Sequence, residues 1–420
     1  MTDSRELDEQ VLGWLSPDGR DPASISQHDA QQLAWWTAPR TWFMRQDELT
    51  EVASACAGLL ETSGRHRAAA ALREHTPAVL AAWARSAQHG RAACHRAMQA
   101  TGVQPPDTPT LVWGSIMGSA EASVLDAAQR MLESAIDTDA FVPGEQSWRS
   151  SQCSLVETWL RAPSPLFAGQ PPVEVVHAER TAHWVEDGTS ARHIIMRAVL
   201  PRLSTPIKPA TDTMEPLRFL LDTINQGIAL TTTGRLPLAF VRDVAARFGW
   251  GMPAFKIRHE GDVVELGELR DLATRTGLIT LRRRPQTLTL TAAGQAALDD
   301  PAQLWATAAA GWFDLDDFAA HVAEIAAAIL LAGPATAAPA LAGAAHEAVA
   351  ASFCDQDGAH PDYREVRTAL WEWLRPGHML RWLSYPPGTT EPLQQLTDPG
   401  RAAAIEGLRH RSRAPLHDPC

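Results

Sequence analysis

Three consecutive arginines, Arg282, Arg283 and Arg284, lie between two short runs in which apolar and polar residues alternate. A guanidinium group keeps its charge at neutral pH, and its planar fork of N–H donors matches the oxygens of a carboxylate or a phosphate. Three such groups at one point of the chain therefore predict a site that holds anions. The alternative is a solvated turn in an arginine-rich chain, since Lys208 and Lys256 are the only lysines among the 37 basic residues.

The residues around the arginines predict an antiparallel hairpin that is followed directly by a helix. The alternating apolar residues are Ile279, Leu281, Leu288 and Leu290. Alternation with a period of two is typical of strands with one buried face. Thr291 then precedes an alanine-rich run, and threonine is a preferred N-cap, so the sequence predicts a helix that begins at Ala292.

Upstream of the hairpin, the pattern predicts three helices and one short strand. In chain order, the expected elements are a helix over 216–227, a strand over 228–231, and helices over 236–249 and 265–277. Residues 213–300 resemble a winged helix-turn-helix domain, in which helix, strand, helix, helix and hairpin follow one another in this order. The resemblance implies that the arginine-bearing hairpin is a wing that holds DNA phosphates and that the third helix lies toward a groove of the DNA.

Two further arginines, Arg270 and Arg275, lie on that third helix and are candidate DNA contacts through the same resemblance. Three carboxylates of the helix, Glu265, Glu268 and Asp271, outnumber them. A helix that enters the major groove is usually neutral or basic, because carboxylates there would meet phosphates. This charge balance favours an alternative function, a protein–protein interaction adaptor built on winged-helix modules.

A second step from hairpin to helix is predicted near the C-terminus. The segment LTAAGQAAL at 290–298 is echoed by LTDPGRAAA at 396–404, and residues 380–396 predict another hairpin. Long actinobacterial proteins of unassigned function are similar to this half of the chain. They share a wing that ends in an LTxxG step and an Asp-Pro-x-x-Leu-Trp segment, here DDPAQLW at 299–305. This resemblance implies a C-terminal winged-helix region and no particular activity.

The patterns together predict a mostly α-helical fold, with a helical N-terminal domain followed by winged-helix modules that contain small β-hairpins. The expected domains are a helical domain over 1–200, a winged-helix module with a basic wing over 213–305, a helical extension over 306–353 and a second, degenerate winged-helix-like module over 354–420. The second module carries no basic wing, which predicts a structural or interaction role for it.

The most basic part of the N-terminal domain is the segment 65–96, in which six arginines and four histidines accompany a single acid. Its Arg85 and Arg96 are candidate contacts for nucleic acid or for an acidic partner. A solvated helical face is the alternative explanation. Within the segment, Thr76 followed by Pro77 predicts the N-cap and first turn of a helix.

Composition and motifs exclude several classes of protein. A net charge of −12 argues against a protein that coats nucleic acid over its whole surface, although a local basic patch is compatible with it. The chain has no Walker loop, no GxGxxG after a strand, no GxSxG elbow and no HExxH, so we expect no enzyme and no cofactor. The five cysteines are scattered without a CxxC pair, which predicts reduced thiols and no metal site. The acidic N-terminus is unlike a secretory signal and the most apolar stretch is too short for a bilayer, so we expect a cytoplasmic protein without a membrane partner.

These observations predict a non-enzymatic DNA-binding protein, such as a transcriptional regulator, whose basic wing holds the phosphates of double-stranded DNA. The adaptor that binds a protein partner is the alternative. An enzyme with an unrecognised active site in residues 1–200 is a third hypothesis. A homodimer is a possible assembly for the first two.

Overall fold

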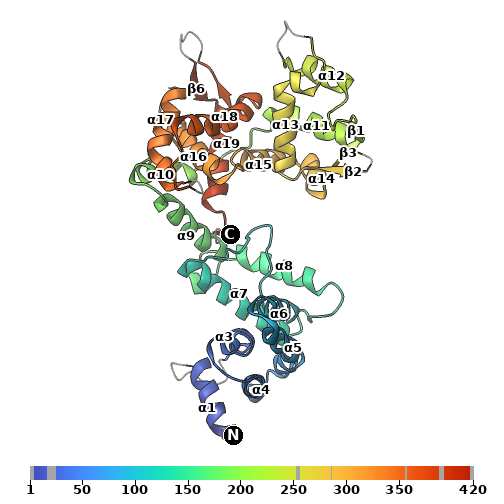
Figure 1. The fold of residues 1–420 in the computed structure, drawn as a ribbon, viewed down its shortest axis with the longest axis vertical. Coiled ribbons are helices and arrows are strands. Elements are labelled where there is room, and N and C mark those ends of the chain that lie inside the picture. Colours follow the sequence, from blue (N-terminus) through green and yellow to red (C-terminus); the bar gives the residue numbers. More distant parts are fainter. Residues whose placement is uncertain are drawn as a thin grey trace. The chain divides into compact units, whose positions relative to one another are not determined.

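The computed structural model describes the chain in six stretches. These are residues 4–16, 25–251, 256–284, 286–354, 357–386 and 392–416. Most of the described residues are helical, and the strands form small antiparallel sheets of three strands (Figure 1). Contacts divide the chain into an N-terminal unit, residues 1–180 with 415–420, and a C-terminal unit, residues 181–414. Among the described helices, none is both long enough and apolar enough to cross a membrane.

The N-terminal unit is built from helices around two apolar clusters. The helices are α1 (Ser4–Leu15), α2 (Gln27–Gln32), α3 (Ala38–Thr41), α4 (Gln46–Thr62), α5 (His66–Arg85), α6 (Ala87–Ala100), α7 (Ser119–Asp137), α8 (Trp148–Arg161) and most of α9 (Pro172–Glu186). A π-helical turn, Leu33–Thr37, joins α2 to α3. Trp35 in this turn is fully buried, and its indole N–H donates to the hydroxyl of Thr76 at 2.9 Å.

The predicted helix start at Thr76 is wrong, because α5 runs without interruption through Pro77. The hydroxyl of Thr76 donates to the carbonyl of Leu72 at 2.6 Å and accepts the indole N–H of Trp35, so it is satisfied inside the helix. The helix ends later, and Ser86 caps the start of α6 with its side chain. A buried tertiary contact therefore outweighs the local preference of proline for a first turn.

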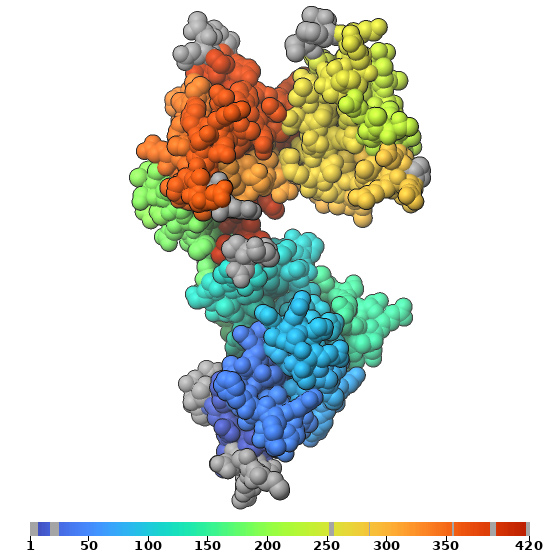
Figure 2. Space-filling view, in the orientation of Figure 1, coloured from blue at the N-terminus to red at the C-terminus, as the bar shows by residue number. Residues whose placement is uncertain are grey.

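The C-terminal unit contains two modules with the same order of elements. The first comprises α11 (Glu215–Asn225), β1 (Ile228–Ala229), α12 (Leu238–Phe248), α13 (Val264–Arg275), β2 (Ile279–Arg283), β3 (Gln286–Leu290) and α14 (Ala292–Asp299). The second comprises α16 (Asp317–Ala332), β4 (Thr336–Ala337), α17 (Ala338–Val349), α18 (Tyr363–Met379), β5 (Leu383–Ser384), β6 (Leu393–Leu396) and α19 (Asp398–Ser412). The unit also contains α10 (Ser190–Leu203) and α15 (Pro301–Gly311). Figures 1 and 2 show the modules as a yellow-green lobe and an orange-red lobe.

Both sheets place the last strand of the module in the middle, in the orders β1-β3-β2 and β4-β6-β5. In the first sheet, Leu288 of β3 pairs with Ile228 and with Leu281, and Ile279 pairs with Leu290. The predicted hairpin over 279–291 is therefore confirmed, as is the helix that follows it.

The second hairpin, β5 with β6, is also present, although its tip at 387–391 lies outside the described residues. Its central strand β6 pairs with β4, a strand from the segment for which the sequence predicted only a helical extension. The two modules thus share sheet topology as well as element order.

The LTxxG echo corresponds to one backbone arrangement that occurs twice. Thr291 and Thr397 are the N-caps of α14 and α19, and their hydroxyls donate to the carbonyls of Gly277 and Arg381. Gly277 and Arg381 end the preceding helices with positive φ angles of 67° and 58°. The threonine in each module therefore joins the start of the last helix to the chain just before the hairpin.

The glycine three residues after each threonine has a steric reason. Gly294 and Gly400 lie against the backbone of Leu278 and Trp382, where an added Cβ would collide with the carbonyl oxygen. Only a residue without a side chain lets the helix approach this closely. The threonine and the glycine that the two segments share are therefore explained by the backbone geometry at these positions.

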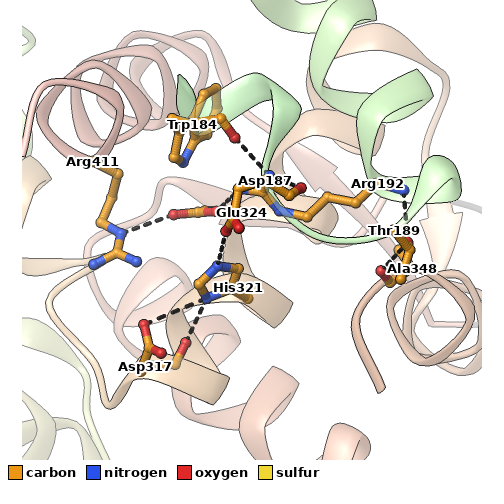
Figure 3. A network of polar contacts seen from close by, with 9 residues as sticks. All are labelled: Trp184, Asp187, Thr189, Arg192, Asp317, His321, Glu324, Ala348 and Arg411. Atoms are coloured by element: carbon orange, nitrogen blue, oxygen red, sulfur yellow. Dashed lines mark hydrogen bonds and ion pairs between the residues drawn. The ribbon is translucent and has the colours of Figure 1, made fainter. Parts of the chain in front are cut away.

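Charged side chains connect α10, α16 and α19 inside the C-terminal unit (Figure 3). Glu324 of α16 is fully buried, and its two oxygens accept from Nη2 of Arg192 at 2.9 Å and from Nε of Arg411 at 2.8 Å. Arg192 is also buried and donates to two backbone carbonyls at the end of α9. Burial alone would raise the pKa of Glu324, but the charges of Arg411, His321 and Arg192 outweigh it and lower the pKa.

His321 lies one turn before Glu324 in the same network. Its Nε2 lies 3.4 Å from a carboxylate oxygen of Asp187, and its Nδ1 lies 2.8 Å from the carbonyl oxygen of Asp317 (Figure 3). Burial lowers the pKa of His321, but the hydrogen bond to Asp187, the charge of Glu324 and the contact with Asp317 together raise it. The same hydrogen bond lowers the pKa of Asp187.

Candidate nucleic-acid interface

The three consecutive arginines form the end of the β2–β3 hairpin, and all three are exposed. Arg282 and Arg283 are the last residues of β2, Arg284 is in the turn, and Pro285 lies outside the described residues. Successive side chains of a strand point to opposite faces, so Arg282 and Arg283 present charge on both faces of the hairpin. None of the three guanidinium groups has an ion pair or hydrogen bond with a described residue, so their donors are available to a ligand.

The two candidate arginines of α13 are engaged within the protein. Nη1 of Arg270 lies 3.0 Å from each carboxylate oxygen of Glu260, and its Nη2 donates to the carbonyl of Gly234 at 3.2 Å. Nη2 of Arg275 donates to the carbonyl of Gly311, at the end of α15, at 3.3 Å. These contacts hold α13 to neighbouring segments and leave its guanidinium groups fewer free donors than the wing arginines have.

The first turns of α13 line a cleft of about 390 Å³ between the two modules. The α13 wall consists of Val264, Glu265 and Glu268. The opposite wall, from α18 and the chain after it, consists of Trp371, Arg375, His378, Met379, Arg381 and Tyr385. In Figure 2 the surface is hollowed between the yellow and the orange-red lobes. A helix that reads the major groove does so with its N-terminal residues, and in this protein those residues face the second module.

One ion pair crosses this cleft. Glu268 lies 3.7 Å from Nη1 of Arg375, and burial raises the pKa of the Glu268 carboxyl. The cleft therefore combines carboxylates of α13 with a basic and aromatic wall from α18. This arrangement can bind a protein segment or a small molecule more readily than it can admit a DNA backbone.

A groove of about 440 Å³ lies between α5 and α6 in the N-terminal unit, and its titratable side chains are all basic. They are His75, Arg85, His89 and Arg96. Arg85 and Arg96 are exposed and form no ion pair with a described residue. The arginines at the other end of α5 are neutralised by the pairs Arg65–Glu133, Arg67–Asp139 and Arg73–Glu61. Free positive charge in the predicted basic segment is thus present at this groove.

Sequence reasoning identified the two arginines of this groove and included the histidines in the same basic segment, but it did not predict the groove that these side chains line. A signal for the groove is present in the sequence, because the helical spacing of His75, Ala78, Ala82 and Arg85 places these four residues on one face of α5. The small side chains of that face leave the space in which a ligand can approach the cations. The break at Ser86, which folds α6 back along α5, was not predicted.

Comparisons with known protein families, with curated proteins and with solved structures give no match. The function of the chain therefore has to follow from the chemistry of its own surfaces. Within the described ranges, no three side chains of histidine, cysteine, aspartate or glutamate are placed to hold a metal ion.

The described cysteines, Cys56, Cys94, Cys153 and Cys354, form no disulfide, and Cys420 lies outside the described residues. Burial raises the pKa of Cys56 to about 12 and that of Cys94 to about 11. Both of these thiols are therefore protonated at neutral pH and poor nucleophiles.

Proposed function

We propose that this chain is a non-enzymatic DNA-binding protein, such as a transcriptional regulator, in which the C-terminal unit carries two winged-helix modules. The first wing, with Arg282, Arg283 and Arg284, holds the phosphate backbone of double-stranded DNA. The observation that supports this function is the exposure, on a narrow hairpin, of three guanidinium groups that have no partner among the described residues. Arginine pairs with phosphate through two parallel N–H donors, which makes such a tip suited to a DNA strand.

The contacts of α13 suggest how the DNA is held. Arg270 and Arg275 are used inside the protein, and Glu265 and Glu268 face a cleft between the modules. Binding then depends on phosphate contacts by the wing more than on base contacts by α13. The net charge of −12 fits a local contact of this kind, because an acidic protein as a whole repels DNA and binds it only at basic patches. Arg85 and Arg96, at the groove of α5 and α6, are a second candidate contact.

The test is the salt dependence of DNA binding, measured by fluorescence anisotropy with a labelled duplex. Replacing the three wing arginines with alanine should weaken binding to every duplex alike and reduce the slope of log K against log salt by roughly 2 to 3, at about 0.9 for each lost phosphate contact. The melting temperature should barely change, because exposed substitutions away from caps alter stability by only ~0.5 kcal/mol.

A matched control separates the wing from total charge. Arg218, Arg364 and Arg367 are exposed and form no ion pair with a described residue, so their triple replacement by alanine makes the same charge change elsewhere. The control protein should keep the wild-type slope. Absence of salt-sensitive binding by the wild type, or equal loss in the control, would refute the proposal.

The adaptor is the second candidate function, and the cleft between α13 and α18 favours it. Glu265 in the cleft and Asp271 outside it lie on the same helix, so Glu265→Lys and Asp271→Lys form a matched pair. If the chain is an adaptor, a partner recovered from nuclease-treated extract should be lost with Glu265→Lys and kept with Asp271→Lys. Loss of the partner on nuclease treatment favours the DNA-binding function instead.

A further inference from the structure

The N-terminal unit contains a cavity of about 610 Å³ between α2, α6, α7 and α8. Its volume lies within the range of roughly 300–1,000 Å³ that is typical of small-molecule sites. Amides dominate its polar lining, which includes Gln32, Gln99, Gln104, Gln129 and Gln152. No arginine considered above for DNA binding lines it, so the cavity is a separate site.

Some polar groups of this cavity are held by hydrogen bonds, and others have no partner among the described residues. Gln129 and Gln152 are buried, and the amide nitrogen of Gln152 donates to the carbonyls of Gly102 at 2.8 Å and Gln104 at 3.0 Å. These two bonds fix the plane of the Gln152 amide. The buried Oε1 of Gln104 and Nδ1 of His28 have no hydrogen-bond partner in the part of the chain that the structure describes. Buried polar atoms of this kind favour a ligand that satisfies them.

The interior of the cavity carries little charge. Burial lowers the pKa of His28, so its ring is largely neutral at pH 7. The two lining residues with a permanent charge, Asp107 and Arg149, are exposed at the surface, and a carboxylate oxygen of Asp107 accepts the backbone N–H of Trp113. An ionic ligand would therefore find no buried counter-charge, and an uncharged ligand that forms hydrogen bonds fits better.

The remaining lining is apolar. The indole N–H of Trp113 donates to the carbonyl of Pro106 at 3.3 Å, so this side chain offers the cavity its ring and no free donor. Met98, Met117 and Leu125 add sulfur and aliphatic surface. Aromatic and thioether groups make favourable contacts with the faces of flat rings.

We propose that this cavity binds a nucleobase. A glutamine amide presents a donor and an acceptor in one plane, which is the pattern that pairs with the edge of a base. Gln152 uses its amide nitrogen on two backbone carbonyls. The amide nitrogens of Gln99 and Gln129 each make one contact, with His95 at 2.9 Å and with His28 at 3.4 Å, so each of these two amides keeps a second N–H and its oxygen for a ligand. An aromatic ring and sulfur atoms beside such amides can cover the face of the base, as in proteins that recognise unpaired bases.

The base can come from a free nucleoside or from an unpaired residue of a single strand, and the experiment distinguishes the two. Isothermal titration calorimetry of the full chain is carried out with adenosine, guanosine, cytidine and thymidine, and with glucose as the non-base probe. Short single-stranded oligonucleotides are then tested as competitors. A competing oligonucleotide identifies the base of a strand as the ligand, and the lack of competition identifies a free nucleoside.

Two variants test the assignment of the amides. Gln99→Leu changes an exposed lining residue of α6, and Gln129→Leu changes a buried one of α7. Each should weaken nucleoside binding about tenfold through loss of hydrogen bonds to the base edge. Gln88→Leu is the matched control, because Gln88 is exposed on α6 and does not line the cavity.

The proposal is independent of DNA binding by the wing, so the triple alanine variant of that hairpin should bind nucleosides like the wild type. If the buried substitution Gln129→Leu prevents folding, the exposed substitution Gln99→Leu still tests the proposal. The proposal is overturned if no nucleoside binds, if glucose binds as well as the nucleosides, or if Gln88→Leu loses as much affinity as Gln99→Leu.

Discussion

Replacing Gly294 with alanine should destabilise the C-terminal unit, even though alanine is the better helix former. A Cβ at this position would lie 2.9 Å from the carbonyl carbon of Leu278 and closer still to its oxygen. Real Cβ atoms essentially never approach another atom within 3.0 Å, so α14 and the chain before the hairpin have to separate. The atoms in the way belong to the backbone and cannot turn aside as a side chain could.

The expected cost follows from what that carbonyl already does. The oxygen of Leu278 accepts the backbone N–H of Thr291 at 3.1 Å and its hydroxyl at 3.3 Å. Weakening a hydrogen bond of this kind costs about 1 kcal/mol, and forcing extra volume into a packed site costs about 1–3 kcal/mol. The higher helix propensity of alanine, compared with glycine, offsets about 1 kcal/mol of this cost. The free energy of unfolding should therefore fall by roughly 1–3 kcal/mol.

Urea-induced unfolding followed by circular dichroism measures this difference. Gly267→Ala is the matched control, because Gly267 lies in α13 with no heavy atom within 4 Å of an added Cβ. It should stabilise the protein by about 0.5–1 kcal/mol. Gly400→Ala, the equivalent change in the second module, should behave like Gly294→Ala, since its Cβ would lie 2.9 Å from Cα of Trp382. Wild-type stability of Gly294→Ala would show that close backbone approach does not explain this glycine.

Two further predictions concern the buried charges of the C-terminal unit. Glu324→Gln should lower the free energy of unfolding by roughly 3–5 kcal/mol, because Arg192 would remain buried without a carboxylate. Urea titration measures the loss, and replacing Glu324, Arg192 and Arg411 together with apolar residues should recover most of it. The pKa of His321 is raised on folding, so its protonated form stabilises the folded chain below the unfolded pKa of about 6.5, and this contribution disappears as pH rises through the folded pKa. The stability difference between wild type and His321→Gln should therefore be largest below about pH 6.5 and shrink as the pH rises above it, and a constant difference contradicts the assignment.

The parts of the fold that the sequence predicted depend on neighbours in the chain. The first hairpin follows from apolar alternation around the arginines, and the helix after it follows from the capping preference of Thr291. The second hairpin was found through the echo of LTAAGQAAL, because both copies need a capping threonine and a glycine at the same spacing. Signals of this type are local, and the physical demand that creates them acts over a few residues.

The parts that the sequence did not predict depend on contacts between distant segments. The contact of Arg275 with Gly311 and the cleft between α13 and α18 arise only when helices from different parts of the chain pack together. The burial of Glu324 between two arginines has the same origin. At Thr76 a local signal was present and a long-range hydrogen bond from Trp35 overruled it. Local residue patterns therefore do not predict such contacts.

The differences between the modules bear more on function than their shared backbone does. Where the first module has Gly277 in the left-handed region, the second has Arg381, whose side chain makes this conformation cost about 1–2 kcal/mol. A glycine would remove that cost, and strain of this kind persists where the side chain has a use. Arg381 lines the cleft opposite Glu265, while the first module has three consecutive exposed arginines on its wing. The first module thus has arginines at its wing and the second has one at the cleft, which fits the proposed phosphate contact at one surface and a partner or an effector at the other.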